Sequence, residues 1–168
     1  MQGVGAAEVV AGHGHGRSIY LREEVSVLAR VFNHMLKNET TIADRIPIDD
    51  QNDDLFNTFS DGIVLIHVLR TIDPNLIDMT KVCLGDNLNV FQVRLNLGLA
   101  LEACKKIIHV VGIDSQSFLD KTPDLILGIL WQLVRHIQGN KIRKRIAGGK
   151  LPRKLTKELS VEYDRYEM

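Results

Sequence analysis

The chain has 168 residues, of which 45% are hydrophobic and 25% are charged, and this composition is typical of one globular domain with a proper core. Its 21 basic residues balance its 21 acidic residues, so the whole chain lacks the positive charge typical of nucleic-acid-binding and membrane-surface proteins. No apolar run reaches the roughly 20 residues of a membrane span, and the N-terminus does not resemble a signal peptide. We therefore expect a soluble cytoplasmic protein that binds neither nucleic acid nor a membrane.

The first 18 residues are small and rich in glycine, and we expect a flexible N-terminal segment over 1–18. His13 and His15 lie in this segment, but two histidines on a flexible chain make a weak metal site. Cys83 and Cys104 lie among apolar residues, which favours two reduced thiols over a single disulfide.

Apolar residues recur at helical spacing from Leu21 to Lys37 and predict an amphipathic helix. The next residues break this pattern and contain the acidic run from Asp49 to Asp54. The run resembles the start of a calcium-binding loop, but Leu55 stands where an EF-hand requires glycine and Asp61 where it prefers glutamate. We expect a solvated acidic loop.

Three further helices follow in the sequence. Ser60-Asp61-Gly62 precedes an apolar helix over 63–72, and Pro74 ends it. Asn87 is positioned to cap a long helix that runs to about His109. That helix is apolar on two faces, which predicts a central, buried position. The two faces consist of Leu88, Phe91, Leu95, Leu99 and Ala103, and of Val90, Leu97, Leu101 and Cys104. A short helix is expected around 115–119.

The last helix is predicted over 123–137, where Thr122 can cap and Pro123 fits the first position. A helical wheel places Leu127, Leu130, Trp131 and Val134 on the core face. Leu125, Ile129 and Gln132 lie opposite, with His136 beyond them and Gly128 on the flank. Such an apolar second face meets either the rest of the domain or a partner protein. The fold class is therefore all-α, with four main helices and short connecting helices around one core.

Motifs of common enzyme classes are absent, including a P-loop, GxGxxG, CxxC, HExxH and a nucleophile elbow. The histidines outside the N-terminal segment, His34, His67, His109 and His136, lie on separate helices or helix ends. We therefore expect a protein that is not an enzyme and that needs no cofactor and no metal.

Three motifs occur in one order: Asp54-Leu55-Phe56 with Asp61-Gly62-Ile63-Val64-Leu65, then Asn87-Leu88 with Leu95-Asn96-Leu97, then the run from Lys121 to Gln132. This order resembles a calponin-homology domain. The stretch from Ile46 to Ile137 is most similar to the first calponin-homology domain of the fimbrin (plastin) family. We therefore expect the calponin-homology domain to cover 19–138, and 139–168 to form a basic linker or interdomain arm.

The resemblance implies a module that binds filamentous actin within a cytoplasmic filament cross-linking (bundling) protein that carries further calponin-homology domains. Carried over by position, the first helix contributes Arg30, Val31, His34 and Lys37 to the actin-binding surface. The last helix and the residue before it contribute Lys121, Leu125, Gly128, Ile129, Gln132 and His136. The alternatives are a calponin-homology scaffold or signalling module that binds actin weakly or not at all, and a microtubule-binding domain of related fold.

Eight basic residues and no acidic residue occur between Lys141 and Lys157. They could add salt-sensitive attraction to a polyanionic filament, or they could keep an interdomain linker soluble. The sequence favours the linker.

Overall fold

The structure is a computed structural model that describes residues 9–11, 19–51 and 53–148. Its elements are β1 (Val9–Ala11), β2 (Ile19–Leu21), α1 (Arg22–Leu36), the 3-10 turn η1 (Thr40–Ile42), α2 (Asp54–Phe59), α3 (Ile63–Ile72), the 3-10 turn η2 (Met79–Lys81), α4 (Val90–Lys105), α5 (Ser115–Leu119) and α6 (Pro123–Ala147). By their contacts the described residues form two compact units that divide between Trp131 and Gln132, so α6 contributes to both.

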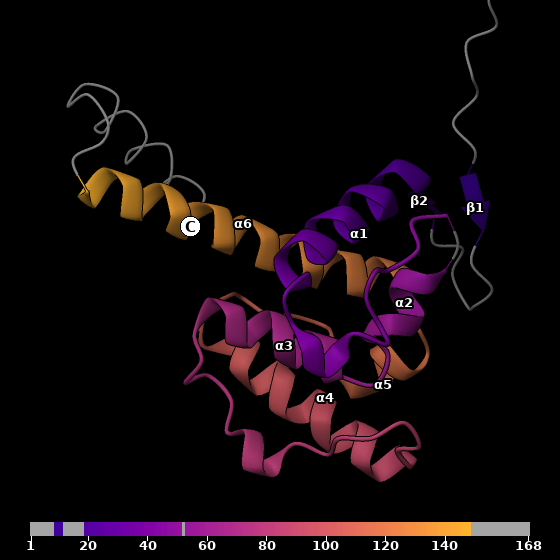
Figure 1. Ribbon diagram of the computed structural model, residues 1–168. Coiled ribbons are helices and arrows are strands. Elements are labelled where there is room, and N and C mark those ends of the chain that lie inside the picture. The colour runs from indigo at the N-terminus through magenta and orange to yellow at the C-terminus, as the bar shows by residue number, and fades with distance from the viewer. Residues whose placement is uncertain (1–8, 12–18, 52, 149–168) are drawn as a thin grey trace, which may run out of the picture. The chain divides into compact units, whose positions relative to one another are not determined.

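Helix α3 is the centre of the first unit. It packs against α1, α2 and α4, and Figure 1 shows it between α1 and α4. Every residue from Ile63 to Leu69 is buried. Gly62, which precedes α3 at φ +83°, allows a close approach to α4, because a Cβ atom there would lie 2.9 Å from the backbone nitrogen of Leu97. The helix expected over 63–72 is thus confirmed.

Helix α4 is less buried than its two apolar faces predict. It begins at Val90, where Asn89 rather than Asn87 forms a capping box with Gln92, and it ends at Lys105. Phe91 is 80% exposed, and Val90 and Leu95 are also exposed. The expectation of a central α4 is therefore wrong, because α3 occupies the centre and α4 turns only one face towards it.

A buried amide holds the chain before α4 in place. The Asn96 side chain accepts a hydrogen bond from the Cys83 backbone N–H at 2.9 Å and donates one to the Cys83 carbonyl at 2.8 Å. Both cysteines are free thiols, as expected, and burial raises the pKa of the Cys104 thiol to about 12. Cys104 is therefore buried in the core, and its thiol stays protonated at neutral pH.

The first helix and the short helix at 115–119 are confirmed as α1 and α5. Phe32 of α1 stacks edge to face on Phe59 of α2, with ring centroids 5.2 Å apart. Helix α2 was not predicted as a separate element, because its six residues are too few to show helical periodicity.

A short strand pair precedes α1, and it was not predicted. Val9–Ala11 pairs antiparallel with Ile19–Leu21, so part of the segment expected to be flexible has regular structure. The rest of that segment, including His13 and His15, lies outside the described residues.

Helix α6 begins at Pro123 as predicted but continues to Ala147, past the expected end at Ile137. The added residues include Lys141, Arg143, Lys144 and Arg145. Lysine and arginine are good helix formers, and their positive charge is favourable near the negative end of the helix dipole. Part of the basic stretch that the sequence assigns to a linker is therefore helical. Residues 149–157 of that stretch lie outside the described residues. Among the residues that the structure describes, no helix is both long enough and apolar enough to cross a membrane.

Candidate functional site

The residues predicted for the first helix share one exposed face of α1. Arg30 and His34 of α1 are exposed, Val31 is half-buried, and Lys37, which directly follows the last residue of α1, is exposed, whereas the buried stripe of α1 lies on the other side of the helix. Positions 30, 34 and 37 follow one another at the spacing of one helical face. Val27 lies on the same face with 43% of its surface exposed, so the face is mixed apolar and basic.

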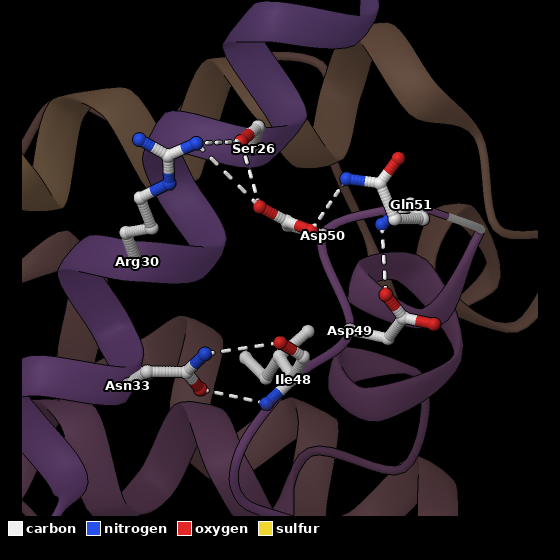
Figure 2. A network of polar contacts seen from close by, with 7 residues as sticks. All are labelled: Ser26, Arg30, Asn33, Ile48, Asp49, Asp50 and Gln51. Atoms are coloured by element: carbon white, nitrogen blue, oxygen red, sulfur yellow. Dashed lines mark hydrogen bonds and ion pairs between the residues drawn. The ribbon is translucent and has the colours of Figure 1, made fainter.

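Arg30 takes part in a polar network that crosses from α1 to the acidic loop (Figure 2). Its guanidinium Nη2 donates to the Ser26 hydroxyl at 3.1 Å and lies 3.6 Å from the Asp50 carboxylate. The Ser26 hydroxyl donates to the same carboxylate at 3.0 Å. Hydrogen bonds from the Gln51 amide and from Ser26, together with the charge of Arg30, hold the pKa of Asp50 below its usual value.

Asn33 fixes the acidic loop against α1. Its side-chain amide donates to the Ile48 carbonyl at 2.9 Å and accepts from the Ile48 backbone N–H at 2.7 Å. Figure 2 shows this pair of bonds one turn of α1 away from the network of Arg30. The loop that carries Asp49 and Asp50 is thus bound to the edge of the exposed face of α1.

The start of α6 carries the second group of predicted residues, and here the structure corrects the helical wheel. Ile129 is only 3% exposed, so it belongs to the core and not to an apolar surface. The buried side chains of α6 are Ile126, Leu127, Ile129, Leu130, Leu133 and Val134. Trp131, which the wheel placed on the core face as its largest side chain, lies half-buried at the edge of that face.

Gly128 is exposed and Leu125 is half-buried, so these two positions remain available on the surface of α6. Lys121, which precedes the helix, is exposed, and its ammonium group donates to the side-chain oxygen of Asn57 in α2 at 2.5 Å. It also has a positive φ of 52°, which is uncommon for a residue with a side chain. The backbone turn and the Asn57 contact together fix the position of this cation.

The indole nitrogen of Trp131 donates a hydrogen bond to the Glu24 carboxylate at the start of α1. This contact joins the first turn of α1 to the part of α6 that lies in the first unit. Seven of the predicted residues thus lie in one compact unit: Arg30, Val31 and His34 on α1, Lys37 directly after it, Lys121 before α6, and Leu125 and Gly128 in its first two turns.

The other two predicted residues lie in the second unit. Gln132 and His136 are half-buried, and the Asn140 amide lies 2.9 Å from the His136 ring nitrogen Nε2.

The prediction did not name Val27, Ser26, Asn33 or Asp50 as contact residues, although Val27 and Asn33 lie in the segment from about Val27 to Lys37 that the family resemblance implies for actin binding. Val27 follows from the spacing of Arg30 and His34, since it is one turn before Arg30. The other three depend on where a loop folds back, and no sequence periodicity reports that. Among the described residues, no group of three or more histidine, cysteine, aspartate or glutamate side chains is placed to hold a metal ion.

Comparison with known proteins finds two relatives in sequence and one solved structure of similar fold. The chain is 30% identical over 133 residues to plastin-1 of Bos taurus and 33% identical over 117 residues to human plastin-3. These alignments cover 79% and 69% of this chain but 21% and 18% of the relatives, so the chain spans about a fifth of their length. The crystal structure of the actin-crosslinking core of Schizosaccharomyces pombe fimbrin matches 70% of this chain and 26% of its own, with a TM-score of 0.65 and 24% identity.

The fimbrin match establishes the likeness of fold. A family model described as the calponin homology (CH) domain covers residues 25–139, which is more than half of the chain and includes α1 through most of α6. The chain therefore belongs to the calponin homology domain family.

Proposed function

We propose that this chain is an actin-filament-binding module of a fimbrin-like cross-linking protein in the cytoplasmic actin cytoskeleton. The observation that carries the proposal is the exposed, mixed apolar and basic face formed by Val27, Arg30, Val31 and His34 of α1 and by Lys37 directly after the helix. A relative of the same fold is the actin-crosslinking core of a fimbrin, and the chain resembles plastins in sequence.

The composition of this face suits a protein partner. Val27 and Val31 supply apolar area that a contact can remove from water. Arg30 and Lys37 complement an acidic surface and raise the rate of association. Two cations around an apolar strip resemble the polar rim and desolvated centre of protein interfaces.

The start of α6 extends the proposed surface. Leu125 adds apolar area, Gly128 permits close approach, and Lys121 adds a cation that Asn57 holds in place. Gln132 and His136 remain in the proposal as positions of the second unit. Ile129 is withdrawn from it, because a residue in the core cannot contact a filament.

A single module has one binding site for a filament, whereas cross-linking requires two. We therefore propose that further calponin homology domains of a longer parent protein supply the second site. This chain alone is expected to bind actin filaments without bundling them.

The test is cosedimentation of the purified chain with actin filaments at low and moderate salt, with microtubules in parallel. Saturable pelleting with actin alone, without low-speed pelleting of bundles, is the expected result. Pelleting with microtubules alone would assign the related microtubule-binding function. No pelleting with either filament would favour the scaffold or signalling module.

Two substitutions connect binding to the proposed face. The double variant Arg30→Ala/Lys37→Ala should weaken actin binding, whereas Lys106→Ala should not, although it removes an exposed cation at the end of α4. An equal loss in both variants would show that net charge, and not this face, governs the pelleting.

A further inference from the structure

Arg30 is the cation at the centre of the exposed face of α1. It already forms an ion pair with the carboxylate of Asp50 in the acidic loop (Figure 2). We propose that Asp50 is an autoinhibitory competitor for Arg30, which acidic groups of the filament must displace when α1 binds. This inference rests on the proposed actin-binding function and adds a regulatory element to the same surface.

The first support is the way the loop is fixed. Two hydrogen bonds join Asn33 to the backbone of Ile48, and the Asp49 backbone N–H donates to Asp54 at 2.8 Å. These hydrogen bonds therefore hold the backbone next to Asp50 in place, so that its carboxylate lies next to α1. Because these hydrogen bonds already hold Ile48 and Asp49 in place, pairing of Asp50 with Arg30 requires little further loss of backbone entropy.

The second support is the asymmetry of the pair. The Arg30 side chain is 74% exposed, whereas the Asp50 side chain is 29% exposed. Asp50 also keeps hydrogen bonds from Ser26 at 3.0 Å and from Gln51 at 2.7 Å. An approaching surface can thus draw the guanidinium away while the carboxylate stays bonded to its other two donors.

The third support is the sign of the charges next to the proposed contact. Asp49 and Asp50 lie on the loop at the edge of the same face, and a fixed carboxylate there repels an acidic partner as well as neutralising Arg30. Removing the charge of Asp50 should therefore release the cation and reduce the repulsion. Exposed ion pairs contribute modestly to free energy, so we expect a change of about two- to fivefold in affinity.

The experiment measures the dissociation constant for actin filaments by cosedimentation at low salt. The variant Asp50→Asn keeps the size of the side chain and one acceptor oxygen while removing the charge. The matched control is Asp86→Asn, which removes an exposed acidic charge from the loop before α4, on the other side of α3 from α1. Both substitutions are also made in the Arg30→Ala chain, and the melting temperature of every variant is recorded.

We expect Asp50→Asn to bind actin filaments about two- to fivefold more tightly than the unchanged chain. We expect Asp86→Asn to bind with the affinity of the unchanged chain. In the Arg30→Ala chain, the gain in affinity from Asp50→Asn should be at most half as large. If Asp50→Asn lowers the melting temperature, Asp50→Ser replaces it as the test, because serine also removes the charge while keeping an oxygen that can accept a hydrogen bond, and it should also tighten binding.

Unchanged or weaker binding of the tested variant, while the original chain binds saturably, would overturn the competitor role and leave the proposed function standing. An undiminished gain in the Arg30→Ala chain, or an equal gain from Asp86→Asn, would overturn it too, since charge alone would then explain the effect. If no form of the chain pellets with actin at any salt concentration, the proposed function fails and the inference fails with it.

Discussion

The indole nitrogen of Trp131 donates a hydrogen bond to the carboxylate of Glu24, and this contact links residues 107 positions apart in the chain. Glu24 lies in the first turn of α1, and Trp131 lies in the middle of α6. Both helices carry proposed filament contacts, so this bond contributes to the orientation of one part of the surface relative to the other. At the edge of the core, Trp131 therefore forms a hydrogen bond through its indole nitrogen and packs against apolar neighbours through its ring.

Glu24→Ala removes the acceptor and leaves the Trp131 N–H without this partner. We expect the free energy of unfolding to fall by about 1–2 kcal/mol, because a partly buried donor loses its hydrogen bond. Denaturant unfolding followed by the fluorescence of Trp131, the chain's one tryptophan, measures this change directly. Glu23→Ala is the control, since Glu23 is exposed and its loss should change stability by less than about 0.5 kcal/mol. Equal effects of the two substitutions would mean that the bond to Trp131 adds nothing.

The sequence predicts where the helices of this fold lie in the chain better than it predicts which face of each helix is buried. The bounds of α1, α3 and α5 follow from apolar spacing and from local signals such as Gly62 and Pro74. Between Leu125 and Val134 of α6 Gln132 is the one polar residue, so the wheel has no polar side to define the orientation of this part of the helix. The predicted core face consisted of Leu127, Leu130, Trp131 and Val134, whereas the buried arc runs from Ile129 through Ile126 to Leu127 and leaves Trp131 half-buried at its edge.

Ile129 and Leu125 distinguish these two orientations of α6. Ile129→Ala should lower the free energy of unfolding by about 2–5 kcal/mol, because it leaves a cavity in the core. Leu125→Ala should cost clearly less, since Leu125 is only half-buried. Chemical denaturation monitored by circular dichroism compares the two variants. A smaller loss for Ile129→Ala than for Leu125→Ala would restore the orientation that the helical wheel suggested.

Gly128 should show opposite effects on stability and on binding. No atom lies within 4 Å of a Cβ added there, so Gly128→Ala should stabilise the helix by about 0.5–1 kcal/mol. If α6 approaches the filament closely at Gly128, the added methyl group should weaken actin binding in cosedimentation. Gly98→Ala in α4 is the control, because Gly98 also has open space around it and should gain stability without loss of binding. Unchanged binding of Gly128→Ala would remove Gly128 from the proposed surface.

The candidate surface was predictable only in part. Arg30, His34 and Lys37 are charged or polar residues on the side of an amphipathic helix away from its apolar stripe, and such residues are exposed for reasons visible in the sequence. The Asp50 carboxylate reaches Arg30 because Asn33 binds the backbone of Ile48. Contacts of this kind depend on the path of an irregular loop, which hydrophobic periodicity does not describe.

His67 makes the stability of the first unit depend on pH. It lies buried in α3, where its Nδ1 is 3.3 Å from the Glu39 carboxylate. Burial lowers the pKa of His67, Glu39 opposes this shift, and the nearby charges of Arg70 and Arg45 add to it. The unfolded chain, in which the pKa of His67 returns to its usual value, therefore binds more protons than the folded chain in the range just below that value.

Stability should consequently fall as the pH drops below about 6.5, with a slope from His67 of at most about 1.4 kcal/mol per pH unit. The measurement is the free energy of unfolding at pH 7.5 and at pH 5.5, above the range in which most carboxyl groups titrate. His67→Gln should be less stable at pH 7.5 but should lose less stability between the two pH values than the unchanged chain. His109→Gln is the control substitution, because it removes a histidine from the surface and not from the core. An unchanged pH dependence in His67→Gln would show that His67 is not the group whose protonation opposes folding.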